Sequence, residues 1–125
     1  MITPIYAAAL TLLMITLSAR VIAYRRAHKI SLGDQGDKGL LKRMRAQANC
    51  TEYAPMGVVL MGLIELQSGP ALILHVVGGL LLVGRVIHAV GFSARPPIMA
   101  LRVWGMLLTF ASYLVAVGTI IVQSL

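Results

Sequence analysis

The chain has 125 residues, of which 58% are hydrophobic and 12% are charged, and its formal net charge is +7. So few charged residues cannot cover the surface of a small water-soluble domain, which excludes that class and favours one domain whose solvent is lipid. The positive charges lie between and beside apolar segments. We therefore expect anionic headgroups of membrane lipid or an anionic ligand as partners, and no nucleic acid.

The first apolar segment predicts a helix from about Thr3 to Tyr24, long enough to cross a hydrocarbon core of about 30 Å. Its basic residues follow the apolar stretch instead of preceding it, which is the reverse of a secretory signal peptide. We therefore expect an uncleaved first span. The next segment, Arg25–Met44, is polar and rich in glycine, and is interpreted as a loop.

Three further helices are expected at about 45–66, 70–91 and 99–122, separated by the breakers Gln67–Pro70 and Ser93–Pro97. The sequence thus predicts an all-α fold, in which residues 1–125 form a single domain: an integral membrane bundle of four transmembrane helices. Four helices of this length bury little surface away from lipid, so a homo-oligomer is expected.

The basic residues determine the expected topology. They lie in or beside the first and third connections, whereas the N-terminus, the second connection and the C-terminus carry no Lys or Arg side chain. The positive-inside rule places the two basic connections in the cytoplasm and both termini outside. The short loops and the lack of a retention tail favour a bacterial inner membrane.

The second predicted helix opens with a polar stripe. Arg45, Asn49 and Glu52 are spaced i, i+4 and i+7 and share one helical face, with Tyr53 beside it, while Gln47 points towards a neighbouring helix. The two charged ends of the stripe are about two turns, or ~10 Å, apart, which is too far for a direct ion pair without side-chain reach but suits a clamp on a small zwitterionic ligand. An interhelical polar network is the alternative, and periodicity alone leaves both open.

Arginines of the other helices are expected at the same depth. Arg85, His88 and Phe92 share one face of the third helix, Arg102 opens the fourth, and Arg25-Arg26 end the first. Together they would form a cationic funnel suited to a multiply charged anion, although a headgroup anchor is the alternative for any single arginine. The histidine has no partner at metal-ligand spacing, so no metal site is expected.

The segment Arg45–Pro55, RAQANCTEYAP, resembles the second-helix signature of the membrane-associated proteins in eicosanoid and glutathione metabolism (MAPEG). It is similar to bacterial-type members and resembles the microsomal glutathione transferases and the cysteinyl-leukotriene synthase branch. The resemblance covers the whole chain, including Arg25-Arg26 and the Gly84-Arg85…His88…Gly91 end of the third helix. It implies a homotrimer that holds glutathione at each subunit interface near the cytosolic face.

The resemblance also implies residue roles. Arg102 looks like the arginine that stabilises the glutathione thiolate in catalytic members, and Arg26 like the neighbour that assists it. His88 and Phe92 stand where the leukotriene branch has tyrosines, which argues against an eicosanoid substrate. The glutathione ligands that the resemblance implies are Arg25, Arg45, Gln47, Asn49, Glu52 and Tyr53, with His88 added from the third helix.

The chemistry of glutathione agrees with this set, because arginines and one glutamate complement its two carboxylates and its ammonium group. A guanidinium beside the sulfur in a poorly solvated site would favour the thiolate, which is the nucleophile. We therefore expect a glutathione transferase that conjugates lipophilic electrophiles, a detoxification activity, with lipid hydroperoxide reduction as a side activity. The alternatives are a non-enzymatic, lipid-binding member of the same family and a structural membrane protein whose arginines bind anionic lipid.

Overall fold

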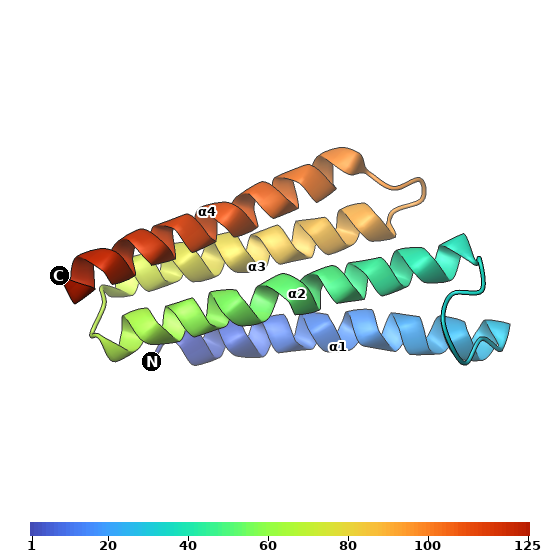
Figure 1. Cartoon of the computed structure of the whole chain (residues 1–125), viewed down its shortest axis with the longest axis horizontal. Helices are drawn as coiled ribbons and strands as arrows, with labels where there is room; N and C mark the ends of the chain where they lie inside the picture. The colour runs from blue at the N-terminus through green and yellow to red at the C-terminus, as the bar shows by residue number, and fades with distance from the viewer.

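The protein is described by a computed structural model that covers residues 1–125. It contains four helices, α1 (Thr3–His28), α2 (Lys38–Leu66), α3 (Ala71–Ser93) and α4 (Met99–Ser124), and no strand. The helices run alternately up and down, so that both termini and the α2–α3 turn lie at one end and the other two connections lie at the opposite end (Figure 1). The all-α four-helix fold is confirmed, and the two basic connections share one end of the bundle.

Three of the helices, α1, α3 and α4, are long and apolar enough to cross a membrane. The remaining helix, α2, begins with a run of bases and carries Glu52 further along, so its apolar character is confined to its second half. Large apolar side chains such as Leu12, Val83 and Leu114 are exposed on the outer faces of the other helices. Lipid-facing side chains of this kind are what an integral membrane protein requires.

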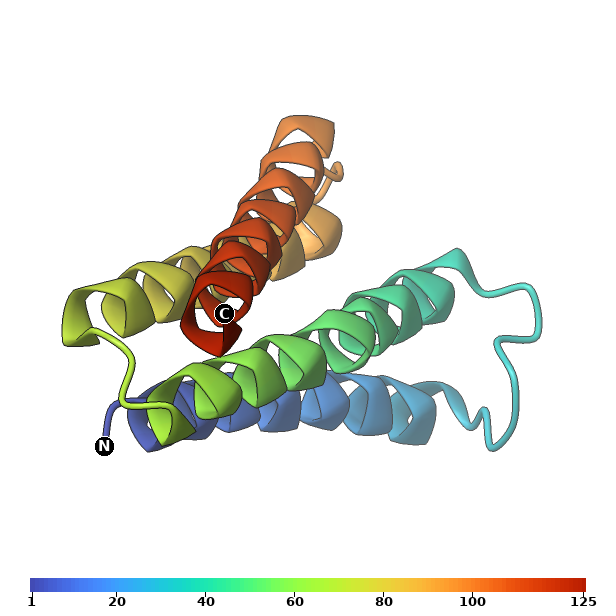
Figure 2. The ribbon, with the colours of Figure 1, turned by 60° about the vertical axis from the view of Figure 1, so that its left-hand side comes forward.

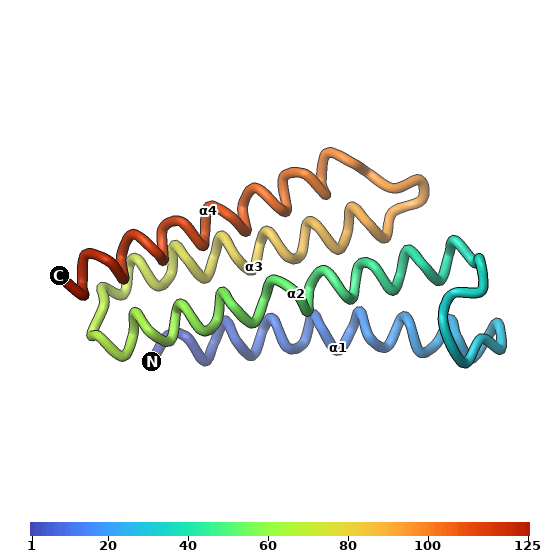
Figure 3. Tube along the Cα trace, viewed as in Figure 1, coloured from blue at the N-terminus to red at the C-terminus, as the bar shows by residue number.

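The bundle is open on one side. Helices α3 and α4 pack closely along their length, α1 packs on α2 and α3, and α1 makes no contact with α4. Figure 2 shows the α3–α4 pair diverging from the α1–α2 pair, and the tube in Figure 3 shows α1 and α2 lying side by side. A Cβ atom on Gly84 would lie 2.9 Å from the carbonyl oxygen of Gly105, so α3 and α4 can approach this closely only because both positions are glycine.

Helix α2 begins at Lys38 and not near Arg45, so part of the segment expected to be a loop is helical. The cause is the N-cap residue Asp37, whose carboxylate accepts a hydrogen bond from the backbone N–H of Leu40 at 3.1 Å. The Tyr24 hydroxyl of α1 donates to the same carboxylate at 2.8 Å, and the Leu40 side chain is fully buried. A cap held by the neighbouring helix, together with this buried leucine, favours helix over loop.

The ends of α1 are also fixed by specific contacts. The backbone N–H groups of Ile2 and Thr3 donate to the carboxylate of Glu65, the second of these bonds being 2.9 Å long. This carboxylate from the end of α2 satisfies the unpaired amides of α1 and faces the positive end of its dipole. At the other end α1 runs on past Tyr24 to His28, and Lys29 ends it in the left-handed conformation.

Candidate functional site

A hollow of about 400 Å³ lies between α2, α3 and α4 towards the basic end of the bundle. We call it the α2–α4 hollow. It contains four residues that the sequence predicted for the site, namely Arg45, Asn49, His88 and Arg102. Its other lining residues are Phe92, Met99, Val103, Met106, Leu107 and Phe110, so one wall is cationic and polar and the other is apolar.

Arg102 is the cation of this hollow with an unused donor. Its guanidinium carbon lies 3.9 Å from the centre of the Phe92 ring, and its Nε atom is buried without a hydrogen-bond partner. A buried donor left unpaired costs about 1–3 kcal/mol, so this group is suited to receive an anion. The start of α4 can lie this close to α3 because residue 91 is glycine. A Cβ atom on residue 91 would lie 2.9 Å from the backbone nitrogen of Arg102, which is too close.

Arg85 was expected to contribute its charge to a cationic funnel, but in the structure its side chain is buried inside the bundle. Its side chain is 1% exposed, and it donates from Nε to the Thr109 hydroxyl at 3.0 Å and from Nη1 to the side-chain and backbone oxygens of Asn49. Its Nη2 atom lies 3.2 Å from the sulfur of Met106. Arg85 therefore links three helices inside the bundle, and it occupies the side-chain oxygen of Asn49.

The predicted α2 stripe is divided in the structure: Glu52 is exposed, whereas Tyr53 is partly buried against α4. Arg45 and Glu52 form an ion pair at 3.8 Å between side chains that are 50% and 52% exposed, so extended side chains bridge the two turns between them. The Tyr53 ring packs edge-on against Phe110 at 5.8 Å between ring centres. Neither Glu52, Tyr53 nor Gln47 lines the α2–α4 hollow.

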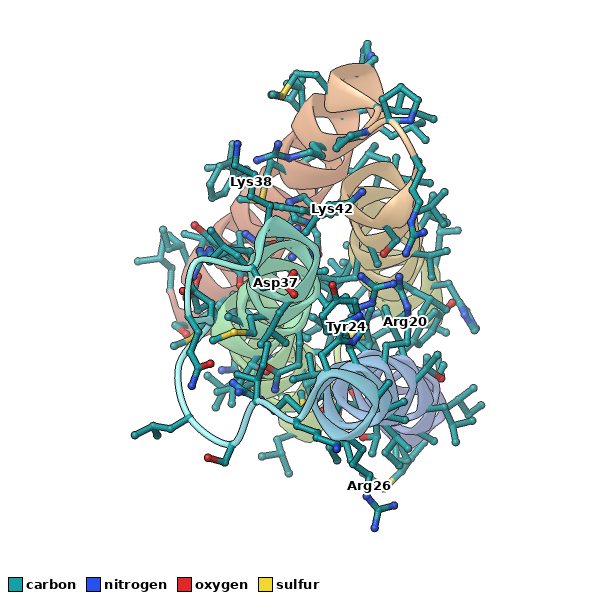
Figure 4. All side chains as sticks on the ribbon, turned by 90° about the vertical axis from the view of Figure 1, so that its right-hand side faces the viewer. Arg20, Tyr24, Arg26, Asp37, Lys38 and Lys42 are labelled. Atoms are coloured by element: carbon teal, nitrogen blue, oxygen red, sulfur yellow. The ribbon has the colours of Figure 1, made fainter.

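Arg25 and Arg26 lie apart from the other predicted residues. They line a separate hollow of about 400 Å³ beside the end of α1, together with Lys29. Arg25 donates to the backbone oxygen of Gly33 at 2.8 Å, while Arg26 points away from the bundle in the view along its axis (Figure 4). Because α1 and α4 do not touch, a single chain does not bring Arg26 together with Arg102.

Several residues of the α2–α4 hollow, among them Met106 and Phe110, were not predicted from the sequence. Met106 and Phe110 follow Arg102 at i+4 and i+8, so the spacing that identified the α2 stripe would have placed them on the same face of α4. Their apolar character gave no reason to apply that test. No group of three potential metal ligands comes together in the structure.

Comparison with known proteins identifies the family of this chain. The MAPEG family model matches residues 3–122. This chain belongs to the MAPEG family. It is 33% identical over 95 residues to Inner membrane protein YecN of Escherichia coli K12, covering 76% of this chain and 72% of that protein, and equally similar to the protein of that name from Escherichia coli O6:H1. No solved structure matches the chain.

Family membership confirms the resemblance inferred from the α2 signature, and the apolar helices agree with the membrane location stated in the names of these relatives. The chain is thus an integral membrane protein of the MAPEG family.

Proposed function

We propose that this MAPEG protein is a membrane-bound glutathione transferase. The observation that supports it most directly is Arg102, which lines the α2–α4 hollow together with Arg45 and has a buried Nε without a hydrogen-bond partner. Two guanidinium groups beside one hollow suit a ligand with several negative charges. Glutathione, with two carboxylates and an ionisable thiol, is such a ligand.

In the proposed reaction Arg102 stabilises the glutathione thiolate. A free thiol of pKa near ~8.5 is mostly protonated at neutral pH, and a nearby guanidinium lowers that pKa by favouring the charged form. The thiol proton passes to water, and the sulfur lone pair attacks the electrophilic atom of the acceptor as the leaving group departs or the product is protonated. The Phe92 ring under the guanidinium keeps water away from one of its faces, which strengthens the charge interaction.

The apolar wall of the α2–α4 hollow suggests the class of acceptor. Val103, Leu107 and Phe110 are exposed side chains of α4, so a lipophilic electrophile could reach the sulfur from the hydrocarbon core. A lipid hydroperoxide would be reduced by the same thiolate, which attacks the terminal oxygen, breaks the O–O bond and releases the lipid alkoxide, which is protonated to the alcohol. The glutathione sulfenic acid that remains reacts with a second glutathione to give the disulfide and water.

We further propose that the protein is a homotrimer whose sites lie between subunits. The separation of Arg25 and Arg26 from the α2–α4 hollow supports this, because a neighbouring copy of α1 could supply the charges that one protomer leaves apart. The basic end of the bundle would face the cytoplasm and both termini would lie outside, so the site would open on the cytoplasmic side.

The test is glutathione binding by the detergent-purified protein, measured as thiolate absorbance in the ultraviolet. We expect a signal that saturates with glutathione and disappears when an electrophile such as 1-chloro-2,4-dinitrobenzene is added. Binding without thiolate absorbance would favour the non-enzymatic, lipid-binding member. A purified protein that neither binds glutathione nor shows thiolate absorbance would refute the proposed transferase activity.

A further inference from the structure

A third cationic hollow, of about 360 Å³, lies at the same end of the bundle, between the end of α1, the start of α2 and the α3–α4 connection. We call it the basic mouth. It shares no residue with the α2–α4 hollow or with the hollow beside Arg25 and Arg26. Its lining residues are Tyr24, Lys38, Gly39, Lys42, Arg43 and Arg95.

The charges of the basic mouth are not balanced by the protein. The only ion pair in the structure is the one between Arg45 and Glu52, so no base of the basic mouth has a carboxylate within 4.0 Å. The one acid nearby, Asp37, already accepts hydrogen bonds from Tyr24 and from the backbone of α2. Burial lowers the pKa of the Lys42 ammonium, and repulsion by Arg95, Arg43 and Arg20 lowers it further.

These cations are held in place by neutral groups. The Lys42 ammonium donates to the backbone oxygen of Ala94 at 2.7 Å, which ties α2 to the α3–α4 connection. Arg43 donates to the backbone oxygen of Gly39 at 2.9 Å and lies 4.4 Å from the centre of the Tyr24 ring. Each contact fixes a position without neutralising the charge. Figure 4 shows Arg20, Tyr24 and Lys42 directed into the space between the helices.

The same cations keep hydrogen-bond donors for a ligand. An ammonium has three N–H groups, and Lys42 uses one of them within the protein. Arg95 makes no side-chain hydrogen bond and no ion pair, so all of its guanidinium donors are available. Arginine and lysine donors around one concave space match the oxygens of a phosphate group better than a single carboxylate.

We propose that the basic mouth binds an anionic phosphate group, carried either by the headgroup of a membrane lipid or by a soluble phosphate. The position of the basic mouth favours a lipid phosphate, because the first and third connections are at the end of the apolar helices, the level at which lipid headgroups are found. The bound phosphate would join α1, α2 and the α3–α4 connection and relieve the repulsion among their bases. The proposal does not depend on glutathione binding.

The test measures thermal unfolding of the full chain purified in a neutral detergent. One arm replaces chloride by inorganic phosphate at constant ionic strength, and the other adds phosphatidylglycerol against phosphatidylcholine. We expect one of these anions to raise Tm by about 3 °C or more, since a ligand that binds only the folded state stabilises it. The variants Arg95→Gln and Lys42→Gln should lose the rise, whereas Lys29→Gln, a base on the first connection outside the basic mouth, should keep it.

The outcomes separate the two sources. A rise with inorganic phosphate identifies a soluble phosphate as sufficient, and a rise only with phosphatidylglycerol identifies the lipid headgroup. Without added anion, Arg95→Gln should unfold at the same or a higher temperature than the unchanged protein, because it removes one repelling charge and no hydrogen bond. An equal rise in the Arg95→Gln and Lys29→Gln proteins, or no rise with either anion, would overturn the proposal.

Discussion

Arg85 and Arg102 lie on facing helices of the most tightly packed pair, yet their surroundings differ. Arg85 is buried and donates to Thr109, to Asn49 and to the sulfur of Met106. Arg102 is half-buried, stacks on Phe92 and has a buried Nε with no partner. The guanidinium of Arg85 is occupied by contacts within the bundle, whereas that of Arg102 has a donor without a partner, as expected of a residue that binds a ligand.

The difference shows how an arginine that holds the bundle together can be told from one that binds a ligand. Both are arginines on apolar helices, where an ionisable group is costly and is retained for a reason. The two arginines differ in whether other helices supply partners for their hydrogen-bond donors: Arg85 has such partners and Arg102 has none. Groups with partners should control stability, and groups without them should control binding.

The largest expected effect is on the stability of the Arg85→Ala protein. The substitution leaves the Asn49 oxygen and the Thr109 hydroxyl without their donor and opens a cavity between three helices, so we expect a loss of about 3 kcal/mol or more. Thermal unfolding in detergent measures it, with Arg102→Ala as the matched control that should unfold near the temperature of the unchanged protein. Equal losses in the two variants would remove the distinction between the two arginines.

The Arg102→Ala protein should instead lose activity. Removing one fixed, positively charged donor that stabilises an anion typically lowers the rate by about 10²-fold. We therefore expect Arg102→Ala to lower the rate of glutathione conjugation by that factor and to abolish the thiolate absorbance. Arg102→Lys, which keeps the charge without the planar fork, should retain part of the activity. Full conjugation by the alanine variant would show that another group stabilises the thiolate.

A smaller effect is expected at the opposite end of the bundle, where Glu65 caps α1. The change Glu65→Gln keeps an acceptor for the amides of Ile2 and Thr3 but removes the negative charge from the helix N-terminus, so Tm should fall by roughly a few degrees. The matched control is Glu52→Gln on the same helix, whose exposed ion pair should add little to stability. A larger fall in the control would contradict this assignment.

The smallest effect concerns pH. The Tyr24 hydroxyl and the backbone N–H of Leu40 hold the pKa of Asp37 below its usual value. A carboxylate with a lowered pKa in the folded state stabilises the protein above its unfolded pKa, near ~3.9, and that contribution is lost as pH falls through the folded pKa. Unfolding measured between about pH 5 and pH 2 should therefore show a slope that Asp37→Asn reduces. An unchanged slope would place the acid sensitivity elsewhere.

The sequence predicted the number and order of the helices because three apolar segments are each long enough to cross a bilayer and turn-forming residues separate them from the helix that carries the polar stripe. It did not predict the start of α2, because the Asp37 cap depends on Tyr24 of another helix. In the structure Arg45, Asn49 and His88, which the spacing within α2 and α3 assigned to polar helical faces, line one hollow with Arg102. It could not show that Arg85 turns inwards, since its partners come from two other helices.

The separation of Arg26 from Arg102 within one chain would have a genetic consequence in the proposed trimer. If each site takes α1 from one subunit and α4 from the next, a copy lacking Arg26 and a copy lacking Arg102 are each inactive alone. Co-expressed, they would assemble into mixed trimers in which one interface combines the intact α1 of one copy with the intact α4 of the other. Two dead alleles would then complement each other, and they could not do so if every site were built within a single chain.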